Sequence, residues 1–329
     1  MSVSEDKRYS LLHNWLETQF SGQPFTLTTA SSDASFRRYF RVSSDNKTWI
    51  VMDAPPEHED VEPFIRIATL LDDNQLPVPK IYQQDLANGF LLLSDLGSTP
   101  YLSVLNTKTA EMLYQKAIDC VIQMQLIDKP NDLPDYDNAL LKRELTLFDE
   151  WFLDRHLSLT KPTFVDDLYQ FLIEEALAQP QAFVHRDYHS RNLMLQADET
   201  PGIIDFQDAV WGAVTYDLVS LLRDVYIQWP TDFVKSLLVY YYEQAIEHGI
   251  LDKSTSFETL QRWFDLIGLQ RHLKILGIFC RLNYRDNKPN YINDLPLTLN
   301  YVFEVCERYP ELSELLSHLQ QPAIKDRIL

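Results

Sequence analysis

Charged and imidazole side chains gather in residues 183–195, FVHRDYHSRNLML, between two apolar ends. Asp187 lies in this stretch, Asn192 follows it in the same stretch, and Asp205 comes further along the chain. Phosphoryl transfer requires one carboxylate that accepts the proton of the acceptor hydroxyl. It also requires a second carboxylate and an amide oxygen that hold Mg²⁺ against the nucleotide phosphates. Asp187 can supply the first group, and Asn192 with Asp205 can supply the second.

The residues between Asn192 and Asp205 predict a short hairpin. LMLQ (193–196) and IIDF (203–206) have strand character, and ADETPG between them is typical of a turn. Such a hairpin would bring Asn192 and Asp205 to one place, with Asp205 at the end of the second strand. The pattern therefore predicts a phosphotransfer site.

Two other interpretations of the cluster stay open. His185, Asp187 and His189 alternate along the chain, so on a strand they would face one way, as in an iron site with two histidines and one carboxylate. That site would leave Asn192 and Asp205 without a role. A solvated polar loop is the other alternative, and the apolar flanks AFV and LML argue against it.

The elements before residue 97 are mainly strands. β-Branched and aromatic residues predict strands at 25–30, 36–42 and 48–54, the prolines of LPVPKIYQQ enforce an extended path, and 88–97 is a buried strand that runs into a turn. Apolar periodicity predicts one helix over 59–73. These elements indicate an antiparallel sheet with one helix on it.

After Gly97 the pattern becomes mostly helical. Apolar residues recur at helical spacing, and helices are expected at 109–127, 140–157, 165–178, 215–226, 232–248, 256–284 and 294–307. The sequence thus predicts an α+β fold of two lobes, a small sheet lobe over 1–97 and a larger helical lobe over 98–329.

His185-Arg186-Asp187, Asn192 and Asp205-Phe206 together resemble the catalytic loop and metal-binding segment of protein kinases. The form H-x-D-x-H-x-x-N, followed by I-D-F-x-D-A, is more similar to the aminoglycoside phosphotransferase family of small-molecule kinases. The resemblance implies a bilobal kinase-like fold and ATP and Mg²⁺ as cofactors. It implies that Asp187 is the catalytic base, that Asn192 and Asp205 are magnesium ligands, and that Ser94, Asp95 and Leu96 form the hinge that contacts adenine. Support of the catalytic loop would come from His185, His189 and Asp217.

The first lobe departs from the kinase pattern in two ways. It has no glycine between Phe25 and Ala54, so SSDASFRRYFRV would replace the glycine-rich phosphate loop, and Met52-Asp53 stands where the third strand should present a lysine. An arginine of the second strand would replace that lysine, or the protein would be a degenerate kinase. Glu62, the usual partner of the lysine, is then expected on a solvated helix face. The candidate phosphate contacts are Ser32, Ser35, Arg37, Arg38 and Arg41.

Segment 269–289 carries a basic stripe. Arg271, Lys274, Arg281 and Arg285 lie within about 80° of one another on a helix whose other faces are largely apolar. This stripe could bind a substrate carboxylate or phosphate, or it could pair with acidic neighbours inside the helical lobe.

A narrower resemblance extends over both lobes. SDASFRRYFRV, VMDAPPE, HRDYHSRNLM, IIDFQDAVWG and RHLKILGIFCRL are together similar to the anomeric N-acetylmuramate/N-acetylglucosamine kinases of bacterial cell-wall recycling. The resemblance implies phosphorylation of a sugar at its C1 hydroxyl, with the basic stripe near the lactyl carboxylate of N-acetylmuramate. Asp208, Trp211 and the helix from Glu144 to Trp151 are further candidates to line the sugar pocket. The alternatives are a kinase of another small alcohol, such as an aminoglycoside, choline or a hydroxy amino acid, and an inactive nucleotide-binding scaffold.

Composition limits the partners. The formal charge of −19 repels nucleic acid and anionic lipid, so neither partner is expected, and no obligate protein partner is indicated. Cys120, Cys280 and Cys306 are far apart and predict reduced, buried thiols. The N-terminal residues do not resemble a signal peptide, and no stretch approaches the ~20 apolar residues of a membrane span. We therefore expect a soluble, cytoplasmic enzyme.

Overall fold

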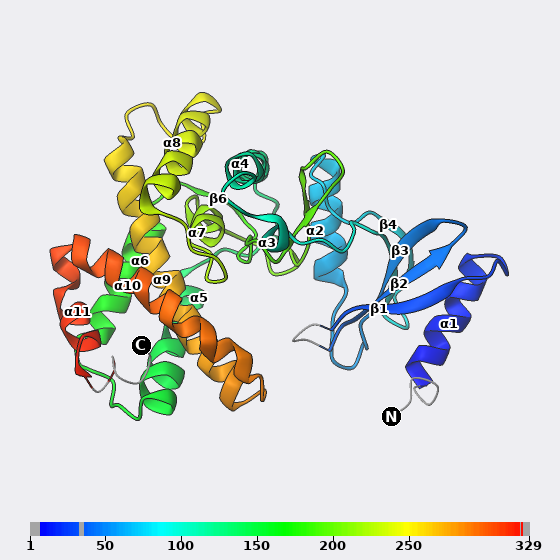
Figure 1. Cartoon of the computed structure of the whole chain (residues 1–329), viewed down its shortest axis with the longest axis horizontal. Coiled ribbons are helices and arrows are strands. Elements are labelled where there is room, and N and C mark those ends of the chain that lie inside the picture. The colour runs from blue at the N-terminus through cyan, green and yellow to red at the C-terminus, as the bar shows by residue number, and fades with distance from the viewer. Residues whose placement is uncertain (1–6, 33–35, 323, 325–329) are drawn as a thin grey trace. The chain divides into compact units, whose positions relative to one another are not determined.

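The computed structural model describes residues 7–32, 36–322 and 324, and it confirms the predicted α+β fold (Figure 1). The chain forms two compact units. The first consists of Met1–Ser103 and Asn192–Asp208, and the second of Val104–Arg191 and Ala209–Leu329. The predicted division at Gly97 placed 98–103 and 192–208 with the helical lobe, whereas the structure groups both segments with the sheet.

The first unit is built on a five-stranded antiparallel sheet with strand order β1-β2-β3-β5-β4. Each predicted strand is present, within a few residues of its expected bounds. The strands are β1 (Thr26–Ser32), β2 (Arg38–Ser44), β3 (Lys47–Asp53), β4 (Ile81–Asp85) and β5 (Phe90–Ser94).

Two helices accompany this sheet, whereas only one was predicted from the sequence. The predicted helix is α2 (Glu62–Asp73), and the additional one is α1 (Lys7–Gln19). Leu12 and Leu16 of α1 are fully buried and pack in one cluster with Phe40, Val42, Val51, Phe90 and Leu92 of the sheet. Their spacing of four residues places both leucines on one face of the helix, so α1 closes the apolar side of the sheet.

The predicted hairpin is present as β7 (Leu193–Leu195) and β8 (Pro201–Ile203). The second strand ends at Ile203, so the expectation that Asp205 ends this strand was wrong. Asp205 follows it with a left-handed backbone, φ 68°. The hairpin is joined to the rest of the first unit by backbone hydrogen bonds, from Leu195 N to Thr99 O (2.8 Å) and from Ile203 N to Pro77 O (2.8 Å).

The second unit is mainly helical, as predicted. Its elements are α4 (Ala110–Gln125), α5 (Asn138–Leu147), the π-helix η2 (Phe148–His156), α6 (Val165–Leu177), α7 (Tyr216–Leu222), α8 (Thr231–Glu247), α9 (Phe257–Tyr284), η3 (Pro289–Asp294), α10 (Leu295–Arg308), η4 (Pro310–Leu312) and α11 (Ser313–Leu319). The short helix α3 (Tyr101–Val104) lies where the two units divide. A two-stranded sheet of β6 (Gln181–Val184) and β9 (Val210–Ala213) precedes and follows the hairpin in sequence, and the sequence analysis did not predict β9.

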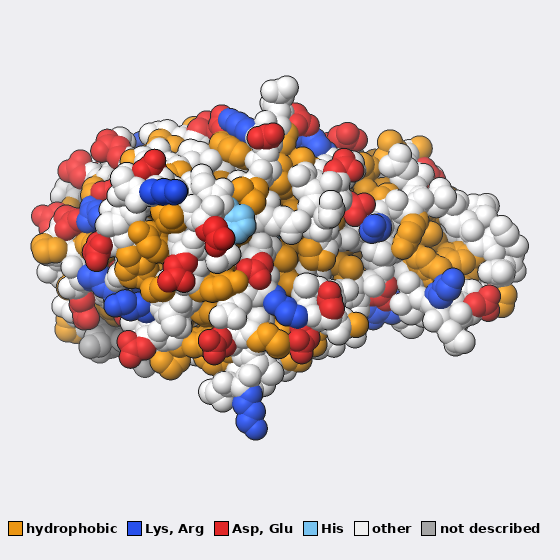
Figure 2. Space-filling view, turned by 90° about the horizontal axis from the view of Figure 1, so that it is seen from above, with side chains coloured by type: hydrophobic (Ala, Val, Ile, Leu, Met, Phe, Trp, Pro, Cys, Tyr) orange, Lys and Arg blue, Asp and Glu red, His pale blue; other side chains and the backbone are white. Residues whose placement is uncertain are grey.

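The surface reflects the acidic composition. Figure 2 shows acidic side chains spread over the displayed face, with fewer basic ones between them. The three cysteines are buried and free, as expected. No helix in the described part of the chain is long and apolar enough to cross a membrane.

Helix α9 crosses the junction between α5 and η2 at a glycine. A Cβ atom added to Gly277 would lie 2.2 Å from the backbone oxygen of Leu147 and 2.3 Å from its carbonyl carbon. Both atoms belong to a helix and cannot move aside without unwinding it. Any larger side chain at residue 277 would therefore push α9 away from α5 and η2.

We accordingly expect Gly277→Ala to lower the free energy of unfolding by about 1–3 kcal/mol or more, as overpacking does. Gly268→Ala in the same helix is the control, because its added Cβ would lie 3.4 Å from its nearest neighbours in Arg223 and Val219, an ordinary contact. Urea titration followed by circular dichroism measures both variants. Equal midpoints for the two would contradict the close approach at Gly277.

Candidate active site

The loop that contains Asp187 is fixed at its start by a buried carboxylate. Asp217 in α7 accepts hydrogen bonds from the backbone N–H of His185 (2.7 Å) and of Arg186 (3.0 Å). Burial raises the pKa of the Asp217 carboxyl to about 6, although the two N–H donors favour its charged form. His185 is also buried, and its Nδ1 lies 3.3 Å from the backbone nitrogen of Asp187. The role of His185 and Asp217 in loop support stays a prediction, and these contacts are what it would rest on.

Arg186 holds the same loop in a strained conformation. Its φ is 76°, a left-handed value that costs energy for a residue other than glycine. Its guanidinium donates to the buried carboxylate of Glu144 in α5, which also accepts from the Tyr136 hydroxyl. Lys274 Nζ lies 3.0 Å from Glu144 Oε1. The surrounding charges thus stabilise a backbone that aims the next residue, Asp187.

A third carboxylate, that of Asp224, fixes the end of the loop and was not among the residues predicted from the sequence. Asp224 is buried and accepts hydrogen bonds from both the backbone N–H (3.0 Å) and the hydroxyl of Ser190. The available signal was an aspartate at the end of the apolar segment LVSLLRD, where a charged residue requires a partner. Asp217 and Asp224 therefore hold the backbone on either side of Asp187.

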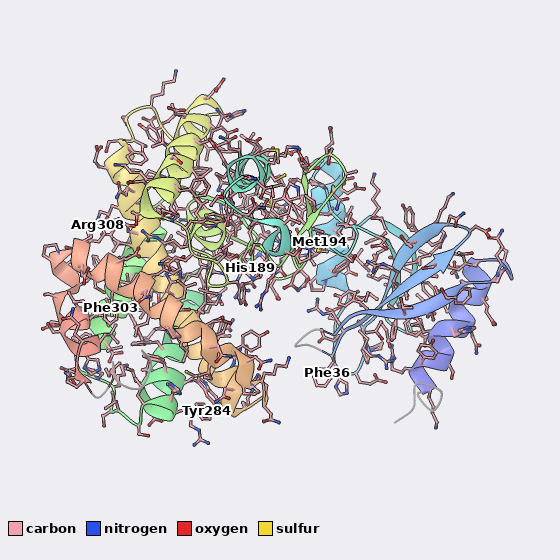
Figure 3. The ribbon with its side chains drawn as sticks, in the orientation of Figure 1. Phe36, His189, Met194, Tyr284, Phe303 and Arg308 are labelled. Carbon is pink, nitrogen blue, oxygen red and sulfur yellow. The ribbon has the colours of Figure 1, made fainter. Side chains whose placement is uncertain are left out.

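Asp187 is kept in its charged form. Burial alone would raise its pKa, but the positive charges of Lys274, Arg271 and Arg186 and the nearby His189 lower it to about 2. The carboxylate is therefore ionised and able to accept a proton at neutral pH. His189, labelled in Figure 3, lies in the loop between β6 and β7, and burial lowers the pKa of its ring, so it is neutral at pH 7.

Asn192 and Asp205 meet within the first unit, as the hairpin predicted. Asn192 Nδ2 lies 3.3 Å from Asp205 Oδ2, and Asp205 Oδ1 accepts from Gln207 Nε2 at 2.8 Å. An amide oxygen and a carboxylate are hard donors of the kind that Mg²⁺ prefers, so these two residues are chemically suited to hold it. No group of three or more His, Cys, Asp and Glu side chains that could hold a metal occurs in residues 7–32, 36–322 and 324. The alternative iron site of His185, Asp187 and His189 is therefore wrong.

The arginines expected to contact phosphates have different surroundings. Arg38 pairs with the fully buried Asp53 (Nε–Oδ2 2.9 Å), which also receives Arg8 Nε at 2.9 Å. Arg41 pairs with Asp95 through two hydrogen bonds of 2.6 and 3.0 Å. Arg37 Nε lies 3.2 Å from Glu59, and Asp205 is close enough to act on the Arg37 charge. Arg37 thus lies within electrostatic range of a predicted metal ligand.

The first unit also contains other residues that were predicted to contact ATP or the sugar. Ser35 is outside the described residues, and Ser32 is the last residue of β1. Ser94 ends β5, Asp95 follows it, and the carbonyl of Leu96 accepts a hydrogen bond from Gln196 Nε2 at 2.7 Å. Asp208 is the last residue of this unit. Glu62 is exposed, as expected for a solvated helix face.

The basic stripe of α9 does not act as one surface. Lys274 is buried against Glu144, which is the structural alternative that the sequence left open. Arg285 is exposed and pairs with the adjacent Asp286 (2.7 Å), and Arg281 lies partly buried between these two environments. Arg271 is buried beside Asp187. Trp211 in β9 is partly buried, with its backbone N–H bonded to Pro134 O at 2.8 Å.

The amino-acid sequence is similar, at 40–48% identity, to three proteins that share one name. The chain is 45% identical to the N-acetylmuramate/N-acetylglucosamine kinase of Pseudomonas aeruginosa, over 95% of this chain and 96% of the relative. It is 48% identical to the protein of the same name from Pseudomonas putida, over 88% and 86% of the two chains. The Neisseria meningitidis serogroup B protein of that name is 40% identical over 95% of each chain.

Solved structures show the same fold at much lower identity. The chain resembles ethanolamine kinase from Plasmodium vivax (TM-score 0.64, 13% identity, 93% and 89% of the two chains). It also resembles the ADP-bound aminoglycoside phosphotransferase APH(2″)-Ib (TM-score 0.59, 14% identity, 90% and 98%). The family model described as the phosphotransferase enzyme family matches residues 26–249, which is more than half of the chain. The chain therefore belongs to the phosphotransferase enzyme family.

Proposed function

We propose that this protein transfers the γ-phosphoryl group of ATP to the C1 hydroxyl of N-acetylmuramate or N-acetylglucosamine. The observation that carries this proposal is the 40–48% identity, over most of the chain, to three relatives named N-acetylmuramate/N-acetylglucosamine kinase. The family membership supports ATP as the phosphoryl donor. The chemistry of the C1 hydroxyl and the state of Asp187 support the choice of acceptor atom.

Asp187 would serve as the general base. The C1 hydroxyl oxygen attacks the γ-phosphorus, the bond from that phosphorus to the β–γ bridging oxygen breaks, and ADP leaves. The hydroxyl proton passes to the Asp187 carboxylate. A hemiacetal hydroxyl is more acidic than an ordinary alcohol. The difference between its pKa and that of the Asp187 carboxyl, which is about 2, is therefore smaller, and proton transfer to Asp187 is less unfavourable.

Asn192 and Asp205 would hold Mg²⁺. The ion would neutralise charge on the phosphate oxygens during transfer. The left-handed backbone of Asp205 aims its carboxylate next to the amide of Asn192. Arg37, which lies near Asp205, would contact the phosphates and replace the charge of the lysine that the third strand lacks.

The product of the reaction tests the proposal directly. Incubation with ATP, Mg²⁺ and either sugar should yield a sugar 1-phosphate, detected by phosphorus NMR and by its hydrolysis in mild acid. An acid-stable 6-phosphate would refute the anomeric assignment. ATP binding without turnover on any sugar or small alcohol would instead favour an inactive scaffold.

Asp187→Asn should reduce kcat by a factor of about 10²–10⁴, the usual contribution of a positioned base, and should leave ATP affinity nearly unchanged. Asp252→Asn is the matched control, because Asp252 lies exposed in a turn where it accepts a hydrogen bond from Ser254. Initial rates and nucleotide titrations measure the two effects. A variant that keeps most of its rate would remove Asp187 from the role of base.

Arg37→Gln should raise the KM for ATP about 10-fold or more, because a charged contact to phosphate contributes about 1.5–3 kcal/mol. Lys47→Gln, at the exposed start of β3, removes the same charge from the same unit and should change little. Steady-state kinetics with varied ATP distinguishes the two variants. An unchanged KM in Arg37→Gln would assign the phosphate contact to another residue.

A further inference from the structure

Arg271 carries a buried guanidinium with unused hydrogen-bonding capacity. Its side chain lies in α9 and the residue is only 3% exposed. Its Nε and Nη1 atoms are buried and donate to no acceptor among the residues that the structure describes. A buried cation without a partner costs several kcal/mol, so a folded protein seldom keeps one without a function.

The other buried cations of this region are paired. Lys274, three residues after Arg271 and on the same side of α9, bonds to Glu144 and lies 3.2 Å from the hydroxyl of Tyr216. Arg223, on the other hand, donates to Asp265 at 2.7 Å. Arg271 therefore differs from these neighbours in forming no hydrogen bond to a carboxylate of the described residues through its Nε and Nη1, although it is equally buried.

The position of Arg271 relates it to the catalytic loop. Its charge acts on Asp187, on His189 and on Tyr226, so it lies within electrostatic range of these three side chains. Lys274 and Arg186 both form ion pairs with Glu144, and Arg186 is the residue before Asp187. The Nδ1 atom of His189 is likewise buried without a hydrogen bond to any described residue. Two unused polar groups thus lie beside the proposed base, where an acceptor must bind.

We propose that Arg271 binds the carboxylate of an acidic acceptor sugar, namely the lactyl carboxylate of N-acetylmuramate, and so favours it over the neutral N-acetylglucosamine. This inference rests on the proposed function, and it assigns to one arginine the role that the sequence left spread over four residues. A guanidinium holds its N–H donors in one rigid plane, and the unused Nε and Nη1 of Arg271 each offer a donor to a carboxylate oxygen. The lactyl group would supply the partner that the protein itself does not provide.

The two sugars form a matched pair, because they differ by the lactyl ether alone. Arg271→Gln should lower kcat/KM for N-acetylmuramate about 100-fold more than that for N-acetylglucosamine, as loss of a buried charged contact does. Any loss that comes from a weaker field at Asp187 should be the same for both sugars, and Lys274 and Arg186 still act on that carboxylate. Arg271→Lys keeps the charge without the planar fork and should give an intermediate loss. Arg262→Gln is the control in the same helix. Its guanidinium pairs with Glu175 and Glu311 and should affect neither sugar.

Thermal unfolding separates recognition from a structural role. Removal of an unpaired buried cation should leave the melting temperature of Arg271→Gln unchanged or raise it. A lower melting temperature with equal losses on both sugars would make Arg271 structural and overturn the inference. Unchanged selectivity in a folded variant would overturn it as well. Failure of the unmodified protein to phosphorylate either sugar at C1 would refute the proposed function itself, which is a different outcome from equal losses in the variant.

Discussion

The hydrogen bonds from the backbone of His185 and Arg186 to the buried carboxylate of Asp217 are the constraint on which the loop around Asp187 depends. They hold a left-handed residue directly before Asp187, in a conformation that the local sequence would not select by itself. Ser190 bonds to Asp224 at the other end of the loop. Two buried aspartates thereby position a third, and the loop needs no regular secondary structure of its own.

Such a concentration of buried carboxylates is costly, and the second unit offsets the cost with buried cations. Glu144 forms ion pairs with both Arg186 and Lys274. Burial would raise the pKa of the Glu144 carboxyl, but these two positive charges lower it. The same positive charges keep Asp187 ionised. A chain with a formal charge of −19 thus keeps several of its few basic residues inside, next to the carboxylate that would accept the proton. The electrostatic potential at Asp187 is therefore set by these buried cations and is positive, whereas the net charge of the chain is negative.

Much of this arrangement could be predicted from the sequence. The sheet, the α2 helix, the hairpin and most helices of the second unit followed from hydrophobic periodicity, and the meeting of Asn192 with Asp205 followed from the hairpin. The comparisons confirmed the family that the motifs indicated. The role of each candidate residue stays a prediction, because no ligand contact tests it.

Other features could not be predicted, for physical reasons. Helix α1 has mixed polarity and is stabilised by two leucines that only tertiary packing buries. Arg38 with Asp53, Arg41 with Asp95 and Lys274 with Glu144 are pairs that are distant in sequence. Periodicity places a charge on a face, but it does not state which opposite charge the fold brings there. The four basic residues of the α9 stripe therefore appeared equivalent in the sequence, whereas in the structure they differ in burial and in their partners.

The hairpin that carries Asn192 and Asp205 belongs to a unit whose other part ends at Ser103. During translation, 88 residues are added between Ser103 and Asn192. The backbone hydrogen bonds of Thr99 and Pro77 to the hairpin can therefore form only after this later segment has been synthesised. The unit encoded first is thus completed late during translation, and a fragment cut after residue 103 would lack part of its own architecture. Any attempt to produce the first unit alone would have to graft residues 192–208 back onto it.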